Sequence, residues 1–209
     1  MSGRQDNLKM FPSIHFYHIA EPSNVASIRR HGLLSTERLV RRTIRSNAEI
    51  SSILGRHRAD RLVLRDGVLI RDQKPMPPHL LGPVLCDGMT PSDWYRLLNR
   101  FVFLWANEER VSRHLRAFRG RQQVVLTLDA RRLLADLGHR TFLSPINSGN
   151  AQRNAVPRSQ KLFTPYLDWL RAGWPVVGSR QRPRSSLPVE VVVQDHLPLS
   201  PYLIDEFLK

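Results

Sequence analysis

Short apolar runs alternate with amphipathic stretches along the whole chain. Five runs have the length and composition of strands: 14–19, 101–105, 123–128, 140–143 and 189–193. The last is the strongest strand signal, because it is apolar apart from one glutamate. Helical spacing of apolar residues predicts helices near 23–32, 36–45, 48–57, 90–99, 107–118 and 129–134, with a last short helix opening at Ser200.

Capping residues support several of these helices. Ser23 and Thr90 are suitable N-caps, and Pro91 fits the first turn after Thr90. Asn107 caps the helix that follows the run 101–105. Gly32 stands where a left-handed residue ends a helix. Strands separated by short helices and loops predict a compact α+β domain.

The length of 209 residues suits a single domain, 1–209. Inside it, we expect an arginine-rich helical insertion at 36–66 and an exposed basic loop at 171–187. No stretch reaches the roughly 18 apolar residues of a membrane-spanning helix, and the first residues lack the apolar core of a signal peptide. We therefore expect a cytoplasmic protein.

The charge indicates the kind of partner. Lysine and arginine number 32 against 18 acidic residues, a net charge of +14. Only four of the basic residues are lysines, so arginine dominates. Guanidinium groups bind phosphates in pairs of hydrogen bonds, so we expect a nucleic acid or another phosphate-rich partner. The alternative is a gene whose base composition favours arginine codons.

Familiar local motifs of catalysis are absent. The sequence has no glycine-rich phosphate loop, no GxSxG and no HExxH. A single cysteine, Cys86, excludes an internal disulfide and any cysteine-rich zinc site. The eight histidines are scattered, so we expect no metal.

Two residues stand out by position. Glu190 interrupts the apolar run 189–193, and a buried lone carboxylate is costly unless it is paired or used. The simpler interpretation is an edge strand that shows this glutamate to water. His18 follows Tyr17 in the first strand, and a histidine there is commonly just a hydrogen-bonded polar residue.

Three blocks, in order, resemble the motifs of the ADP-ribosyltransferase fold. The first is F-Y-H-I-A-E-P-S-N-V-A-S-I-R-R-H-G-L-L-S, a strand with an aromatic residue and a histidine before a helix closed by Gly-Leu. The second is V-F-L-W-A-N-E-E-R-V-S-R-H-L followed by Q-V-V-L-T-L-D-A-R-R-L, and the third is P-V-E-V-V-V-Q-D-H-L-P. The spacing is most similar to the DarT-like DNA ADP-ribosylating toxins. The resemblance implies two packed mixed or antiparallel sheets with short flanking helices.

The same resemblance implies roles for the matched residues. His18 would hydrogen-bond the adenosine ribose or the nicotinamide end of NAD, which serves as co-substrate. Tyr17 and Trp105 would line the nicotinamide pocket, although Trp105 is equally suited to a core. Glu190 would contact the nicotinamide ribose and stabilise the positive charge that develops on it.

The DarT-like enzymes also use an arginine from a loop between the first two motifs. Arg71 is the candidate for that arginine, since a pyrophosphate needs such a charge. The chain departs from the pattern of this fold in two places. The second block has Phe-Leu-Trp where better-known branches carry tyrosine or serine. In the third block, Pro188 stands where a second Glu or Gln would precede Glu190. The geometry used on protein arginines is therefore missing, which favours another acceptor.

Two loops are candidates for binding that acceptor. The loop before the third block offers amide, hydroxyl and guanidinium groups that suit bases and phosphates: Asn147, Ser148, Asn150 and Arg153. The alternative is an ordinary polar surface loop. The basic loop offers Arg180, Arg182 and Arg184, which we expect on one face with the arginines of the helix 107–118.

Together these features favour an NAD-dependent mono-ADP-ribosyltransferase that modifies a nucleic acid, with a DNA base preferred over RNA, acting as a toxin or defence effector. An antitoxin ADP-ribosylhydrolase is a conceivable partner. Two alternatives stay open: an enzyme similar to the RNA 2′-phosphotransferases, and a non-catalytic basic nucleic-acid-binding module on a degenerate version of the fold.

Overall fold

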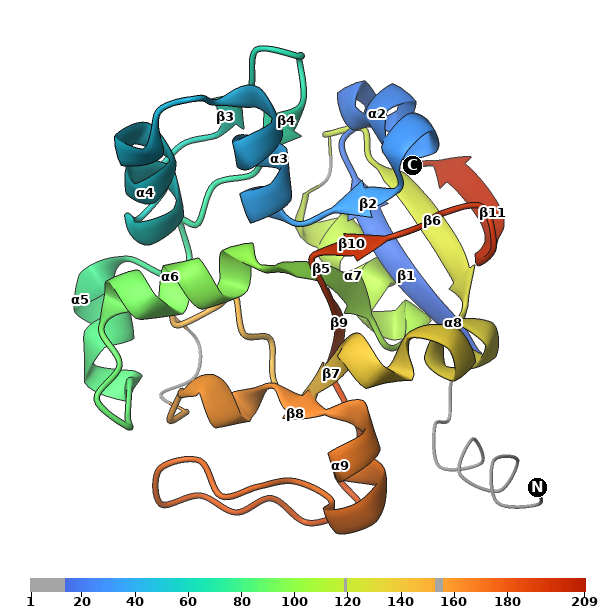
Figure 1. Ribbon diagram of the computed structural model, residues 1–209. Helices are drawn as coiled ribbons and strands as arrows, with labels where there is room; N and C mark the ends of the chain where they lie inside the picture. The colour runs from blue at the N-terminus through green and yellow to red at the C-terminus, as the bar shows by residue number, and fades with distance from the viewer. Residues whose placement is uncertain (1–13, 119, 153–155) are drawn as a thin grey trace.

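The computed structural model describes residues 14–118, 120–152 and 156–209. Its main feature is a seven-stranded antiparallel sheet in the order β11-β6-β1-β5-β9-β7-β8 (Figure 1). The strands are β1 (His15–Ala20), β5 (Phe101–Trp105), β6 (Val124–Asp129), β7 (Thr141–Ser144), β8 (Thr164–Pro165), β9 (Glu190–Gln194) and β11 (Leu203–Leu208). The expectation of a fold that mixes helices with an antiparallel sheet is confirmed.

The sheet is nearly divided in two. Six residue pairs join β1 to β6 and five join β5 to β9, but one pair, Tyr17 with Trp105, joins β1 to β5. A three-stranded half, β11-β6-β1, therefore meets a four-stranded half, β5-β9-β7-β8, at a single point. We expected two separate sheets; the structure shows one sheet whose halves separate beyond that pair.

The helices lie around this sheet, and their caps explain where several begin. They are α2 (Val25–His31), α3 (Thr36–Thr43), α4 (Asn47–Gly55), α5 (Pro78–Leu81), α6 (Pro91–Asn99), α7 (Glu108–Ala117), α8 (Ala130–Leu137) and α9 (Tyr166–Ala172). Thr90 and Asp93 form a capping box at α6. Asn107 accepts a backbone hydrogen bond at the start of α7, and Asp129 does the same at α8.

Separate apolar clusters hold the helices in place. The largest contains residues of both half-sheets, among them Phe16, Leu104 and Val191, together with residues of α8 and α9. On the opposite face, α7 packs on the three-stranded half through Val111, which contacts a cluster with Tyr17. Figure 1 shows α7 behind the sheet. Residues near the start of α7 consequently lie beside the junction of the two halves.

The arginine-rich insertion has its own apolar core. It contains α3, α4 and a small hairpin of β3 (Leu62–Val63) and β4 (Leu69–Ile70). Val40, Leu54 and Ile70 are among its buried residues, so the unit continues past residue 66 to 70. It packs on the rest of the molecule through contacts between α4 and α6. Another short ladder, β2 (Leu33–Leu34) with β10 (His196–Leu197), lies in front of the sheet (Figure 1).

Two local predictions are wrong, and the exposed basic loop is confirmed for most of its residues. Asn24 rather than Ser23 precedes α2, because Pro22–Asn24 forms a short 3-10 turn. The last element is strand β11 rather than a helix, and it pairs along the outer edge of β6, which would otherwise show unpaired backbone groups. The basic loop is only partly exposed, because Trp174 within it is buried in the main core.

No helix in the described residues is long and apolar enough to cross a membrane.

Candidate active site

Glu190 is the first residue of an interior strand. It pairs with Trp105 on one side and Ser144 on the other, so β9 is not an edge strand. Its side chain is only 5% exposed. Tyr17 pairs with Trp105 in turn, and residues directly opposite in a sheet share a face. Tyr17, Trp105 and Glu190 therefore stand in one row across the junction of the half-sheets.

The loop after β7 folds back onto this glutamate. The backbone N–H of Ser148 donates to Glu190 Oε2 at 3.0 Å, and the Ser148 hydroxyl donates to the same oxygen at 2.7 Å. The loop is held in shape by Ser144, whose hydroxyl donates to the Ile146 carbonyl at 2.9 Å. Both bonds from Ser148 end on Oε2, so they orient the carboxylate from one side.

Burial raises the pKa of Glu190 to about 7. The bonds from Ser148 and the nearby charges of Arg110 and Arg158 oppose this rise without cancelling it. The carboxylate and the neutral acid are therefore both populated near neutral pH. A carboxyl group in this state can act as a charge stabiliser or as a proton acceptor.

His18 lies where the two half-sheets separate. Its Nδ1 is 2.9 Å from the carbonyl oxygen of Phe103 on β5. A carbonyl only accepts, so Nδ1 donates and the neutral ring presents a lone pair on Nε2. Burial, with a smaller contribution from the positive charge of Arg71, lowers the pKa of His18 to about 4, although the bond to Phe103 opposes the shift. His18 is therefore neutral at pH 7 and offers an acceptor.

Two residues of the row with Glu190, Tyr17 and Trp105, are aromatic. Tyr17 is 9% exposed, and burial raises the pKa of its hydroxyl, with a contribution from Glu108. The ring of Trp105 lies 6.2 Å from that of His114 on α7. Tyr17 belongs to the apolar cluster under α7 and Trp105 packs against it, so both also contribute to the core.

Arg71 belongs to a buried polar network beside His18. Its Nε donates to Glu21 at 2.7 Å, and another of its nitrogens donates to the Gln123 side chain at 2.8 Å. Arg121 also donates to Glu21, at 2.5 Å, and His114 Nε2 lies 3.3 Å from Arg71. Arg71 is thus fixed at the His18 end of the site, and the charges that act on Glu190 are Arg110 and Arg158 instead.

Of the loop residues predicted to bind an acceptor, Ser148 is the one that contacts Glu190. The side chain of Asn147 accepts from the Gly149 N–H at 3.1 Å, and that of Asn150 accepts from the Gln152 N–H at 3.0 Å. Both bonds shape the loop. Arg153 lies outside the described residues.

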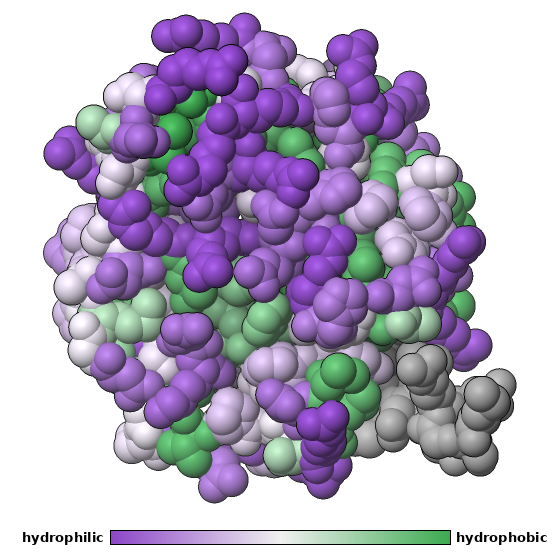
Figure 2. Space-filling model, in the orientation of Figure 1, coloured by the Kyte–Doolittle hydropathy of each residue, from purple (hydrophilic) through white to green (hydrophobic). Residues whose placement is uncertain are grey.

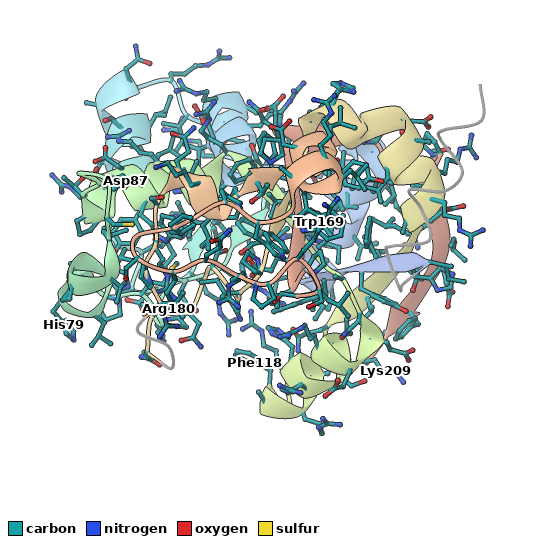
Figure 3. The ribbon with its side chains drawn as sticks, turned by 90° about the horizontal axis from the view of Figure 1, so that it is seen from below. His79, Asp87, Phe118, Trp169, Arg180 and Lys209 are labelled. Atoms are coloured by element: carbon teal, nitrogen blue, oxygen red, sulfur yellow. The ribbon has the colours of Figure 1, made fainter. Side chains whose placement is uncertain are left out.

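The three arginines of the basic loop differ in their surroundings. Arg184 donates to the carbonyls of Leu170 and Arg171 at 3.0 and 3.3 Å, so it caps the end of α9, and its role in binding an acceptor stays a prediction. Arg180 and Arg182 line a small cavity next to Trp174. Figure 3 shows Arg180 on the same side of the molecule as Phe118, at the end of α7.

Sequence reasoning missed two charged residues near Glu190. Arg158 is fully buried and donates to the carbonyls of Val156 and Asn150 at 2.8 and 2.6 Å. Arg110 is in the first turns of α7. Nothing in the sequence separates Arg158 from the many other arginines. For Arg110, the signal was its place just after the strand that carries Trp105.

Within the described residues, no group of three or more His, Cys, Asp and Glu side chains is arranged to hold a metal ion. The comparison with curated proteins finds no match to the chain. One protein family, described as "Family of unknown function (DUF7002)", matches residues 14–201, which is most of the chain. The chain therefore belongs to the DUF7002 family.

Proposed function

We propose that this protein is an NAD-dependent mono-ADP-ribosyltransferase whose acceptor is a nucleic acid. The observation that carries the proposal is the buried Glu190, which is held by Ser148 in one row with Tyr17 and Trp105. Burying a carboxylate at an interior strand position, with a pKa near 7, costs folding free energy, and such groups are found mainly where they have a function. The function that we assign to this carboxylate is to stabilise a positive charge on a substrate.

The proposed step transfers ADP-ribose from nicotinamide to the acceptor. The bond between the nicotinamide nitrogen and the ribose C1′ breaks, and nicotinamide leaves with the bonding electron pair. The ribose becomes positively charged, as in glycoside hydrolysis, and the ionised Glu190 stabilises it through the 2′-hydroxyl. A nucleophilic atom of the acceptor then bonds to C1′ and loses its proton, for which a carboxylate is a suitable base.

The neighbouring residues suit the two ends of NAD. The neutral His18, with its lone pair on Nε2, can accept a hydrogen bond from a ribose hydroxyl. Trp105 and Tyr17 offer aromatic surface for the nicotinamide ring. Arg71 and Arg121 bring positive charge to the His18 end, where a pyrophosphate would be favoured, although both are already bonded to Glu21.

A nucleic acid suits the charge of the molecule. The net charge is +14, and Arg110, Arg180 and Arg182 are basic groups on α7 and the basic loop. Such a field favours polyanions over proteins. The DNA base remains the preferred acceptor, and a cognate ADP-ribosylhydrolase remains a conceivable partner.

The test is a product assay with NAD and short oligonucleotides. We expect nicotinamide release and an oligonucleotide that gains the mass of one ADP-ribose group. Glu190→Gln should lower the rate on the order of 10²–10³-fold while the protein stays folded. Asp129→Asn, at the N-cap of α8 and three strands from β9 in the sheet, is the matched control and should retain turnover.

Other results decide against the proposal. Near-native turnover in a folded Glu190→Gln protein contradicts the role of Glu190. Removal of the phosphate from 2′-phosphorylated RNA, without base modification, identifies a 2′-phosphotransferase-like enzyme. Salt-sensitive binding of oligonucleotide with no consumption of NAD identifies a non-catalytic binding module.

A further inference from the structure

A polar groove lies at the opposite end of β9 from Glu190. Its volume is about 510 Å³, and it is bounded by the insertion on one side and by α6 and the end of β9 on the other. Arg41 from α3, together with Arg96 and Arg100 at the end of α6, lines it. Because a strand rises about 3.3 Å per residue, the groove is roughly 13 Å from Glu190 along β9. It is therefore a different site.

The carboxylates in this groove are already paired. Glu37 is bound by Arg41 at 2.8 Å, and Asp195 is bound by Arg38. The guanidinium of Arg96 donates to the carbonyl and the hydroxyl of Ser51 at 3.1 and 2.8 Å, and these acceptors carry no charge. No carboxylate of the described residues forms an ion pair with Arg96 or Arg100. The groove thus has two positive charges in excess.

Backbone geometry fixes the two walls. A Cβ atom at Gly55 would lie 2.6 Å from a nitrogen of Arg96 and 2.8 Å from the Ser92 hydroxyl, so glycine there leaves room for the Arg96 side chain between α4 and α6. Asp195 has a φ of 66°, a left-handed conformation that turns the chain between β9 and β10. These two constraints hold the walls with Arg96 and Asp195 in place.

We propose that this groove binds the phosphate backbone of a single-stranded nucleic acid. Guanidinium groups without acidic partners are suited to phosphate oxygens. The volume is in the range that holds a molecule of drug size, which suits the few nucleotides of one strand. Figure 2 shows hydrophilic side chains gathered over this part of the molecule. The inference concerns binding alone and does not depend on the proposed transferase activity.

The test compares two variants that lose the same charge. Arg41→Gln/Arg100→Gln changes the groove, and Arg131→Gln/Arg132→Gln on α8 is the control, since both pairs are exposed and neither includes Arg96, which holds α6 to α4. Binding of a fluorescein-labelled twelve-nucleotide single strand is followed by anisotropy at several salt concentrations. Far-ultraviolet circular dichroism and the urea midpoint show that each variant is folded.

We expect the groove variant to bind at least tenfold more weakly than the parent. Its log–log salt slope should become shallower by about 0.7, because Arg100 supplies one phosphate contact to a single strand, whereas Arg41 is already paired with Glu37. The control should stay within twofold of the parent. Nicotinamide release from NAD is measured on the same variants, and weaker oligonucleotide binding by the groove variant supports the inference whatever the outcome of that assay, which keeps the two proposals separate.

Two results overturn the inference. One is a groove variant that binds the oligonucleotide with the affinity and slope of the α8 control. The other is a groove variant that loses direct binding of inorganic tripolyphosphate, measured by calorimetry, but keeps its affinity for the oligonucleotide, which would make a small polyphosphate the ligand. If the double variant does not fold, Arg100→Gln alone decides, with an expected slope change of about 0.7.

Discussion

At the scale of single residues, the burial of Glu190 lowers the folding stability of the protein when this carboxyl group is ionised. In the folded protein burial raises its pKa from 4.5 to about 7. A group whose pKa is raised by folding stabilises the fold below its unfolded pKa, and that contribution is lost as the pH rises through the folded value. Above pH 7 the ionised Glu190 therefore lowers the stability of the protein.

Glu190→Gln should consequently be more stable than the parent at pH 8. The pKa difference corresponds to a gain on the order of 3 kcal/mol in the free energy of unfolding. The gain should shrink toward zero near pH 4.5, where the parent is protonated. Urea unfolding of both proteins at pH 4.5 and pH 8 measures it, and an equal difference at both pH values would contradict the raised pKa.

The sequence revealed Glu190 because a carboxylate in an apolar strand is visible as a break in a pattern. It did not reveal Arg158, because the burial of that arginine depends on carbonyls from two loop segments, Val156 and Asn150. The bond from Arg184 to the end of α9 was missed for the same reason: it depends on a chain reversal that no local pattern encodes.

At the scale of elements, His18 connects the fold to the site. Beyond the pair Tyr17–Trp105, β1 and β5 no longer form a ladder, and the carbonyl of Phe103 receives the His18 ring instead. The hydrogen bond that joins His18 to β5 uses Nδ1 alone, whereas binding of a substrate would use Nε2. Substitutions that retain one nitrogen separate the two tasks.

His18→Asn places an amide nitrogen near the position of Nδ1 and should keep the bond to Phe103. We expect near-parental stability and a loss of NAD affinity in this variant. His18→Leu removes the donor and should also lower the free energy of unfolding by about 1–3 kcal/mol. Calorimetry with NAD and urea unfolding measure the two effects; unchanged NAD affinity in a folded His18→Asn protein would leave His18 with a structural role only.

The elements with complete local signals were predicted well. Helix α6 has its capping box and its proline, and β9 has its valines, so each begins close to the expected residue. Strand β11 was mistaken for a helix, because Ser200–Pro201 has the local form of a helix start while the deciding interaction is the edge of β6. The split between β1 and β5 likewise depends on tertiary pairing.

At the scale of the whole molecule, two histidines set the response to acid. Burial lowers the pKa of His18 and of His114 to about 4, below the ordinary value of 6.5. The ion pairs of Glu21 lower the pKa of that carboxyl against its burial. The contributions of the histidines are complete above pH 6.5 and are lost as the pH falls through 4.

The protein should therefore lose stability between pH 6.5 and pH 4. Glu190 acts in the opposite direction over part of this range, but two histidines outweigh one carboxyl. Unfolding free energies from urea titrations at pH 7, 5.5 and 4 measure the loss, and His18→Asn should make it smaller. A free energy that stays level or rises on acidification would contradict these assignments.

The place of β9 in the sheet has a consequence for how the molecule assembles. β9 lies between β5 and β7, yet it is formed by residues 190–194 of a 209-residue chain. While the ribosome is still adding the residues before 190, β5 and β7 each expose a strand edge without a neighbour, and such edges invite pairing with other chains. Glu190 itself arrives with the strand that closes this gap. The nascent chain thus passes through an aggregation-prone interval that ends in the same event that completes the site.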